Sequence, residues 1–350
     1  MQIVSRCVSF SRHGNPAEVL SLTRSVVNTA NIGEKEVLIR WLAAPINPLD
    51  INIIQGTYVN LPELPGIGGT EGVAMIEAVG SQVQNLIKGD MVIPRPILGK
   101  SNRGSWRDYD ITEAESLQKV DSRVDLVSAA TFMVNPPTAY VMLTEYVSLS
   151  KGDYVIQNSA NSGVGRCAIQ IARALGYKTI NLIRDRPNVD ALKSELKQLG
   201  ADYVFTEDEF RSQSKKLLAN LGHSIQLGLN GVGGKSALMV SATLGFGATF
   251  ITYGGMSKKP SEFLTSSFVF KNLKAIGVAI GFWMALPENK KSMEKMFRHL
   301  EEMIMSDQLK PIPVDKHSIE NFDEGIRRTL AGNSKKQLIV MNENRSSSKL

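Results

Sequence analysis

An apolar run, a turn of small residues and a helical pattern follow one another directly between residues 154 and 176. Residues 154–156 form a short apolar run, and residues 159–165 form a turn rich in Ser, Asn and Gly. Apolar side chains then recur at helical spacing as far as Gly176, and residues 179–183 form a second apolar run. This order predicts a βαβ crossover whose helix begins at the glycine turn. Backbone N–H groups at such a helix start bind phosphate, so the stretch predicts a dinucleotide site.

The glycine pattern of this turn is imperfect. Against the pattern G-x-G-x-x-G, the chain offers Ala160, Ser162 and Gly165, with Gly163 as an additional glycine. A tight turn uses the same residues for purely structural reasons, so the motif alone is weak. The strand before it and the helix after it favour nucleotide binding over a structural turn.

The residues after the second strand indicate which dinucleotide is bound. A site for NAD places a carboxylate there, whereas this chain has Arg184, Asp185 and Arg186. Guanidinium groups form charge-assisted bonds with phosphate, so the two arginines suit the 2′-phosphate of NADP(H). Surface arginines at a strand end remain an alternative, and Asp185 is able to bind a ribose. We favour NADP(H) over NAD.

Length and composition fit a two-domain enzyme. The chain has 350 residues, ordinary fractions of hydrophobic (43%) and charged (21%) side chains, and no apolar run long enough for a membrane span. Two cysteines are too few for a structural zinc site built on thiolates. The net charge of +6 is moderate and dispersed. It favours anionic small molecules or an acidic partner over a nucleic-acid surface.

The two halves of the chain have different patterns. Short strands and turn signals dominate residues 36–94, which predicts a separate β-rich domain. Strands and helices alternate after residue 150, which predicts a doubly wound parallel sheet with its ligand at the carboxyl ends of the strands. At the N-terminus, scattered Arg and Ser resemble a transit peptide, but the apolar residues between 3 and 10 favour a first strand.

Several local elements follow from the same patterns. Ser128 is a candidate helix N-cap, residues 135–140, which begin Asn135-Pro136-Pro137, predict a break, and residues 275–280 predict a strand. Residues 293–305 predict an amphipathic helix, and residues 336–341 predict a last strand.

The chain resembles the medium-chain dehydrogenase/reductase superfamily, and within it the mitochondrial trans-2-enoyl-CoA (enoyl-acyl-carrier-protein) reductases. The matching segments extend over nearly the whole chain: AAPINPLDINIIQGTY, LPELPGIGGTEGVA, VIQNSANSGVG, INLIRDRP, TYGGM and KKQLIVM. The resemblance implies an α/β protein with a GroES-like catalytic domain, residues 1–133 completed by 284–350, and a Rossmann domain, residues 134–283. It also implies NADPH-dependent reduction of 2-enoyl thioesters, carried by CoA or acyl carrier protein, in mitochondrial fatty acid synthesis, by a homodimer.

The same resemblance assigns roles to individual residues. Tyr58 is the implied proton donor, and a phenol is protonated at neutral pH. Trp283 lies where the family keeps a tryptophan near the acyl pocket, although a buried core indole explains it equally well. The implied cofactor contacts are Asn135, Asn161, Ser162, Gly163, Val164, Arg184, Asp185, Arg186, Tyr253, Gly254, Gly255, Met256, Val278, Ala279, Ile280 and Lys336.

Three positions have a second explanation or differ from relatives. Lys336 is also explained as a surface lysine beside Lys335. Ala279 stands where the family has a bulky aromatic residue, which leaves the preferred acyl length open. Zinc-dependent relatives carry a histidine where this chain has Thr70, in the segment Gly69-Thr70-Glu71, so no catalytic zinc is expected.

Two other functions remain open from the sequence. An NADPH:quinone reductase of the same superfamily needs the same cofactor site but no proton-donating tyrosine. A non-catalytic NADPH-binding regulator needs neither Tyr58 nor Trp283. The matching segments favour the enoyl reductase over both.

Overall fold

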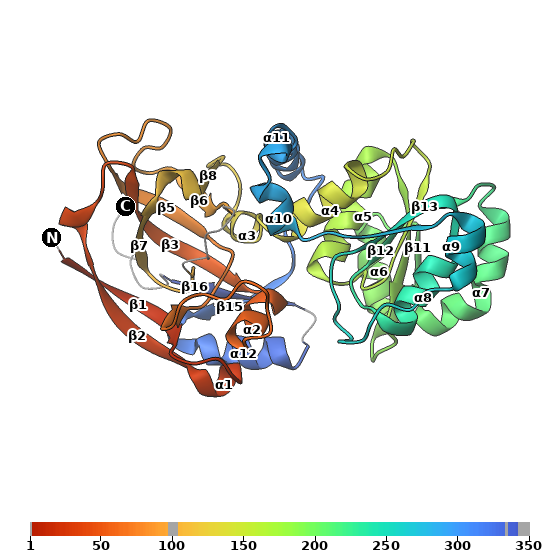
Figure 1. The fold of residues 1–350 in the computed structure, drawn as a ribbon, viewed down its shortest axis with the longest axis horizontal. Helices are drawn as coiled ribbons and strands as arrows, with labels where there is room; N and C mark the ends of the chain where they lie inside the picture. Colours follow the sequence, from red (N-terminus) through yellow and green to blue (C-terminus); the bar gives the residue numbers. More distant parts are fainter. Residues whose placement is uncertain (1, 97–103, 333–334, 342–350) are drawn as a thin grey trace. The chain divides into compact units, whose positions relative to one another are not determined.

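The computed structural model describes residues 2–96, 104–332 and 335–341, and the chain divides into two units (Figure 1). Unit 1 consists of Met1–Val134, Met284–Glu288 and Pro311–Leu350, and unit 2 of Asn135–Trp283 and Asn289–Lys310. The sequence placed all of residues 284–350 with the first domain. The structure instead groups Asn289–Lys310 with unit 2, because the helix in this segment packs against the first helix of that unit.

Unit 1 is built on β-sheets. A three-stranded sheet has the order β2-β1-β4, and a seven-stranded sheet has the order β15-β16-β3-β5-β6-β8 with β7 paired to β3. Its elements are β1 (Gln2–Phe10), α1 (Pro16–Val19), β2 (Leu20–Asn28), η1 (Thr29–Asn31), β3 (Glu36–Ile46), α2 (Pro48–Ile54), β4 (Gly66–Ile67), β5 (Val73–Val79), β6 (Met91–Pro94), β7 (Tyr109–Glu113), η2 (Ala114–Ser116), β8 (Leu117–Val120), α3 (Leu126–Ala130), β15 (Val314–Ser318), η4 (Ile319–Asn321), α12 (Phe322–Leu330) and β16 (Lys336–Val340).

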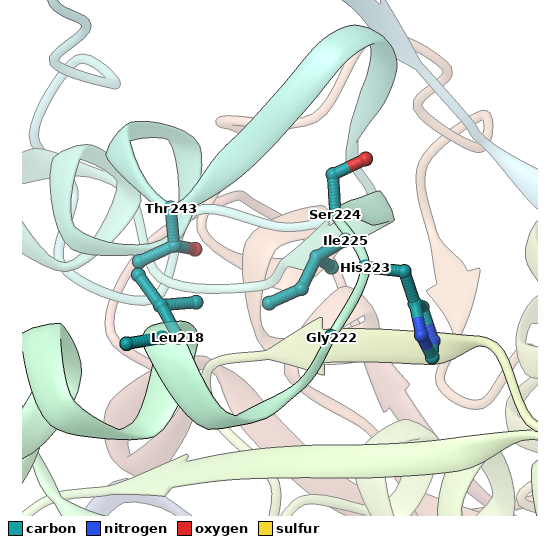
Figure 2. Close-up of a pocket in the computed structure, with 7 residues that line it drawn as sticks. Leu218, Gly222, His223, Ser224, Ile225 and Thr243 are labelled. Carbon is teal, nitrogen blue, oxygen red and sulfur yellow. The ribbon is translucent and has the colours of Figure 1, made fainter.

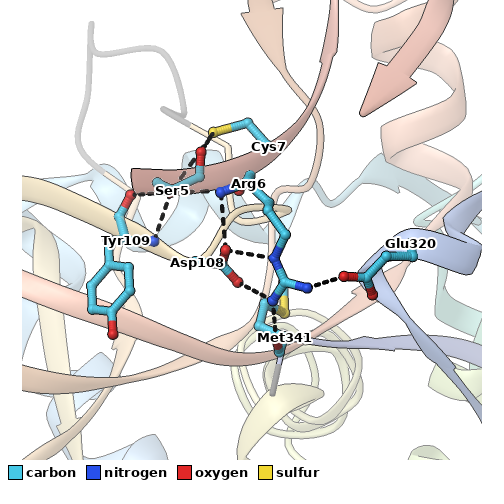
Figure 3. A network of polar contacts seen from close by, with 7 residues as sticks. All are labelled: Ser5, Arg6, Cys7, Asp108, Tyr109, Glu320 and Met341. Atoms are coloured by element: carbon cyan, nitrogen blue, oxygen red, sulfur yellow. Dashed lines mark hydrogen bonds and ion pairs between the residues drawn. The ribbon is translucent and has the colours of Figure 1, made fainter. Parts of the chain in front are cut away.

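A polar network joins the first and last strands of unit 1 (Figure 3). The Arg6 guanidinium donates to Asp108 at 2.8 and 2.7 Å and to the carbonyl oxygen of Met341 at 2.6 Å. Arg6 also pairs with Glu320 just before α12. The N-terminal residues therefore form a strand within the fold, as the apolar pattern predicted.

Unit 2 contains a six-stranded parallel sheet in the order β11-β10-β9-β12-β13-β14. This order is that of a Rossmann fold, so the predicted doubly wound sheet is confirmed. Its elements are α4 (Asn135–Thr144), β9 (Tyr154–Gln157), α5 (Gly163–Leu175), β10 (Lys178–Ile183), α6 (Val189–Leu199), β11 (Tyr203–Thr206), α7 (Glu207–Asn220), β12 (Ile225–Asn230), α8 (Gly234–Ala242), β13 (Leu244–Thr252), α9 (Thr265–Lys271), β14 (Lys274–Gly277) and α11 (Lys290–Met305). The segments α10 (Ile280–Ala285) and η3 (Pro287–Asn289) run through the boundary between the units.

Three local predictions were wrong. Asn135-Pro136-Pro137 is no break but the first turn of α4, where proline is tolerated because no intrahelical N–H bond is required. Asp125, not Ser128, caps α3, since its side chain accepts from the N–H groups of Val127 and Ser128 at 3.0 and 3.1 Å. The strand expected over residues 275–280 ends at Gly277, and a helix begins at Ile280.

Apolar side chains fill the interior of each unit. A cluster around Trp41, Ile76 and Trp106 forms the core of unit 1. Clusters around Ile156 and Phe250, and around Ile169 and Leu196, form the core of unit 2. Within the described ranges, no helix combines the length and apolarity that crossing a membrane requires.

Candidate functional site

The turn between β9 and α5 depends on two close approaches. A Cβ atom at Gly165 would lie 2.6 Å from the carbonyl oxygens of Ser159 and Ala160. A Cβ atom at Gly163 would lie 2.6 Å from Oδ1 of Asn135. Real Cβ atoms do not approach other atoms so closely. Gly165 therefore needs glycine, because its neighbours are backbone atoms, whereas a side chain at position 163 would require the Asn135 side chain to move. Of the pattern read from the sequence, Gly165 provides the close contact between the helix and the turn that precedes it.

The start of α5 presents backbone donors at this turn. Ser162 caps the helix, and its Oγ accepts from the N–H of Gly165 at 3.1 Å. The N–H groups of Gly163 and Val164 have no intrahelical acceptor, because they lie in the first turn of the helix. Asn161 to Val164 are half-buried and remain accessible. The turn therefore offers an anion the N-terminus of a helix of 13 residues.

Two buried polar atoms that lack a hydrogen bond of ordinary geometry in the described structure flank the same turn. One is Nδ2 of Asn135, whose amide lies against Gly163. The other is the hydroxyl of Tyr253, which follows β13. Burial raises the pKa of Tyr253 to about 12, and a weak polar contact of its hydroxyl with the Ser162 side chain opposes this rise. Because buried polar groups are normally satisfied, these two atoms indicate that a polar ligand completes the site.

Two arginines follow β10, the strand beside β9. Arg184 and Asp185 are exposed and Arg186 is half-buried. Burial and the charge of Arg184 lower the pKa of Arg186. The N–H of Arg186 donates to Oδ1 of Asp185 at 2.9 Å, and neither guanidinium forms an ion pair with a described acidic residue. Two cations close together, neither of them in an ion pair with a described acidic side chain, favour a bound phosphate.

The remaining residues expected at the cofactor lie after β13 and β14. Because all six strands are parallel, their carboxyl ends share the edge that carries the glycine turn. Met256 is exposed and its N–H donates to the carbonyl oxygen of Gly231 at 3.1 Å. The other residues of this set differ in exposure: Gly254 and Ile280 are half-buried, Gly255 and Ala279 are exposed, and Val278 is buried.

Trp283 lies in α10 and is 8% exposed. Its carbonyl oxygen accepts from Nδ2 of Asn289 at 2.8 Å. This burial supports the core-packing role that the sequence left open, and contact with an acyl chain stays a prediction.

The sequence analysis missed an asparagine pair at the same edge. Asn158, directly after β9, donates from Nδ2 to Oδ1 of Asn230 at 2.7 Å and accepts from the N–H of Gly231 at 2.8 Å. Both asparagines are fully buried. They hold the ends of β9 and β12 together beneath the turn. The signal available in the sequence was an asparagine at the end of each of the two apolar strands.

Tyr58 belongs to unit 1, in the segment after α2. Its ring is half-buried, and burial raises the pKa of its phenol. The phenol is therefore protonated at neutral pH, as proton donation requires. No described residue forms a hydrogen bond with its hydroxyl, which leaves that group available to a ligand.

A buried polar cluster lies close to the start of α2 in unit 1. Lys336 donates from Nζ to Oδ1 of Asn47, and Asn47 donates from Nδ2 to Oε2 of Glu71 at 2.9 Å. Asp50 accepts from the N–H of Asn47 and from the Thr70 hydroxyl, both at 2.7 Å. Lys336 is thus a member of an internal network rather than a surface lysine, and its contact with a cofactor stays a prediction.

Burial dominates the electrostatics of this cluster. It raises the pKa of Asp50 to about 6 and raises the pKa of Glu71, while the charge of Lys336 lowers both. Glu71 also accepts from the N–H of Val134 at 2.8 Å. Thr70, which stands where zinc enzymes have histidine, is occupied with Asp50. The described residues contain no group of three or more His, Cys, Asp or Glu side chains arranged to hold a metal ion.

One hollow in unit 2 lies away from these residues (Figure 2). It has a volume of about 400 Å³ and is lined by residues that include Leu218, His223 and Thr243. His223 and Ser224 precede β12, so the hollow lies at the amino end of that strand, opposite the glycine turn. It is not part of the candidate site.

Two family models match the chain in sequence. The alcohol dehydrogenase GroES-like domain matches residues 33–122, and the zinc-binding dehydrogenase model matches residues 163–301. The first match lies within unit 1, and the second begins at the glycine turn.

The chain is also similar to named proteins along its whole length. It is 44% identical to a mitochondrial enoyl-[acyl-carrier-protein] reductase of Caenorhabditis elegans. The aligned 346 residues cover 99% of this chain and 98% of the relative. A solved complex of Etr1p with NADP and crotonyl-CoA is 32% identical, with a TM-score of 0.88, covering 97% of this chain and all of that one. The mitochondrial 2-enoyl thioester reductase Etr1p/Etr2p heterodimer of Candida tropicalis has the same identity, TM-score and coverage.

The raised pKa of Asp50 predicts a pH-dependent stability. The pKa of Asp50 is about 6 in the folded state, above its ordinary value of 3.8. The contribution of this carboxyl group to the free energy of unfolding is therefore fully present below pH 3.8 and is lost as the pH rises through 6. Asp50→Asn removes this titration. We expect the stability of the variant relative to the wild type to increase by on the order of 1–3 kcal/mol between pH 4 and 7. Urea unfolding across this range measures the difference, and a difference independent of pH would contradict the assignment.

Proposed function

Because this chain belongs to the mitochondrial enoyl-[acyl-carrier-protein] reductases, we propose that it reduces the carbon–carbon double bond of 2-enoyl thioesters with NADPH. The single observation that carries the assignment is the composition of the carboxyl edge of the parallel sheet in unit 2. There, a helix N-terminus, two buried polar atoms without a well-formed hydrogen bond among the described residues, and two arginines separated by one residue are brought together.

These groups fit the parts of NADPH. The N–H groups of Gly163 and Val164 suit the pyrophosphate, because the helix start favours negative charge. Arg184 and Arg186 suit the 2′-phosphate. The buried atoms of Asn135 and Tyr253 offer hydrogen bonds to polar groups of the bound dinucleotide. When bound, NADPH supplies a hydride for the β-carbon of the substrate.

Tyr58 is the proposed acid of the reaction. Hydride addition at the β-carbon leaves negative charge on the thioester oxygen and on the α-carbon, and the α-carbon must then accept a proton. The Tyr58 phenol holds that proton at neutral pH, since burial raises its pKa. The protein's share of the chemistry is to bind both substrates, to orient them and to deliver this proton.

The relatives also bear on substrate and compartment. The substrate class is a 2-enoyl thioester, as the crotonyl-CoA complex of Etr1p supports, and the carrier is CoA or acyl carrier protein. The reaction belongs to fatty acid synthesis, and the compartment is the mitochondrion. The quinone reductase and the regulator are less well supported, because the identity to enoyl reductases extends over 99% of the chain.

We further propose that the protein is a homodimer. β14 is the last strand of the sheet in unit 2, so one of its edges lacks a neighbouring strand within that sheet. The adjacent helix α9 exposes Phe268, Val269 and Phe270. An exposed strand edge beside exposed apolar side chains favours association with another chain. The Etr1p/Etr2p protein of Candida tropicalis, to which this chain is similar, is a heterodimer, and this supports a dimeric assembly here.

The substitution Tyr58→Phe tests the proton donor. Phenylalanine preserves the ring but removes the acid, so turnover of crotonyl-CoA should fall roughly 10²–10⁴-fold while the KM values change little. Tyr109→Phe is the control, because Tyr109 is also half-buried in unit 1 and its hydrogen bonds with Ser5 involve its backbone. Steady-state kinetics measure the effect, with a quinone assayed beside the enoyl substrate. Near-normal turnover of the Tyr58 variant would place the acid elsewhere.

The double substitution of Arg184 and Arg186 by alanine tests the choice of cofactor. Each lost contact with the 2′-phosphate costs about 1.5–3 kcal/mol, so the KM for NADPH should rise far more than that for NADH. Lys197→Ala removes an exposed cation of α6 and should leave both values unchanged. An equal rise in KM for NADPH and NADH in the arginine variant would show that Arg184 and Arg186 do not distinguish the two cofactors.

Phe270→Asp tests the dimer. Placing a carboxylate in the apolar surface of α9 should shift the protein from dimer to monomer in light scattering, with an unchanged circular dichroism spectrum. Val4→Asp introduces the same charge at an exposed site of unit 1 and should leave the mass unchanged. A wild-type protein that is monomeric at micromolar concentration would overturn the proposal.

A further inference from the structure

A buried arginine lies in the first turns of α5, close behind the glycine turn. Arg166 is 4% exposed, although it stands in a helix whose other buried residues are mostly apolar or small. A buried guanidinium is unfavourable unless hydrogen bonds satisfy its donors. Its partners therefore explain why the fold keeps a charge at this position.

The first partner of Arg166 is the glycine turn itself. Nε of Arg166 donates to the carbonyl oxygen of Asn161 at 3.1 Å. That carbonyl belongs to the peptide that joins Asn161 to Ser162, the N-cap of α5. The bond therefore fixes the orientation of the peptide directly before the N–H groups that face the proposed pyrophosphate position.

The second partner of Arg166 is a carboxylate on the next helix. Nη1 and Nη2 donate to Oε1 and Oε2 of Glu195 at 2.7 and 3.0 Å, a bidentate fork. Glu195 lies in α6, and the hydrogen bond from Arg166 is the main cause that lowers its pKa. α6 begins at Val189, three residues after Arg186. Glu195 thus belongs to the helix that follows the arginine loop, the segment Arg184–Arg186 between β10 and α6.

We propose that Arg166 is a positioning residue that links the two phosphate-binding segments of the cofactor site. One guanidinium holds the pyrophosphate turn through Asn161 and the helix after the 2′-phosphate loop through Glu195. The inference rests on the proposed function, because it assigns phosphate binding to both segments. It adds that their spacing is set by a residue that does not itself contact the dinucleotide.

The geometry distinguishes this role from that of an ordinary ion pair between helices. An ion pair that only stabilises unit 2 would affect unfolding without affecting the affinity for dinucleotides. The same helix provides such a pair, since Nζ of Lys193 lies 2.6 Å from Oε1 of Glu209 on α7. Among the described residues, no hydrogen bond joins Lys193 to the glycine turn or to the arginine loop. It is therefore a matched control within α6.

Dissociation constants for NADPH and NADH, measured by fluorescence titration on the full-length chain, test the proposal. Arg166→Met removes the bond with the turn and should weaken the binding of both cofactors by about 5- to 30-fold. In Glu195→Gln, Arg166 keeps its hydrogen bond with Asn161 but loses the ionic fork. The dissociation constant for NADPH should rise at least threefold, and that for NADH should change less than twofold. Arg166→Lys should not restore the affinity, because an ammonium lacks the planar fork. The turnover number at saturating NADPH should stay within twofold of wild type in all three.

Lys193→Met should lower the melting temperature and leave both dissociation constants unchanged. Wild-type affinity in folded Arg166→Met and Glu195→Gln proteins would overturn the positioning role while leaving the enoyl reductase assignment intact. Glu195 is a solvent-accessible residue, so its glutamine variant keeps the test valid if Arg166→Met does not fold. A wild-type protein that binds neither cofactor would overturn the proposed function, and this inference with it.

Discussion

The close approach of α5 to the turn that follows β9 is the constraint on which the cofactor site depends. At Gly165 a side chain of any size would overlap two carbonyl oxygens of the turn, 2.6 Å from the Cβ position. Only this approach allows the helix to start directly at the carboxyl edge of the parallel sheet, with its first N–H groups exposed there. The cap at Ser162 and the contact of Asn135 with Gly163 follow from the same geometry.

The two units satisfy their buried charges in different ways. In unit 2, the buried Arg166 is paired with a carbonyl and a carboxylate, whereas the exposed Arg184 and the half-buried Arg186 form no ion pair with a described acidic residue. In unit 1, the carboxyl groups of Asp50 and Glu71 are buried near Lys336. The satisfied charges hold backbone in place, while the unsatisfied pair provides the attraction for an anionic ligand.

Local sequence patterns were sufficient for the features that depend on neighbouring residues. The βαβ crossover, the end of its helix at Gly176 and the arginines after β10 were all predicted, because each needs only a short stretch of chain. The helix at Asn135 was missed because two prolines also fit a break. Arg166 with Glu195, and Lys336 with Asn47, join residues 29 and 289 positions apart. Such pairs are formed by the tertiary fold, so no local pattern reveals them.

Isotope tracing of a single turnover tests the central claim most directly. The protein would be incubated with crotonyl-CoA and NADPH deuterated at the transferable position of C4, and the product analysed by NMR and mass spectrometry. A second reaction would use unlabelled NADPH in D₂O. The account predicts butyryl-CoA with cofactor deuterium at C3 in the first reaction and solvent deuterium at C2 in the second. Oxidation of NADPH without saturated thioester, or cofactor deuterium found at C2, would contradict it.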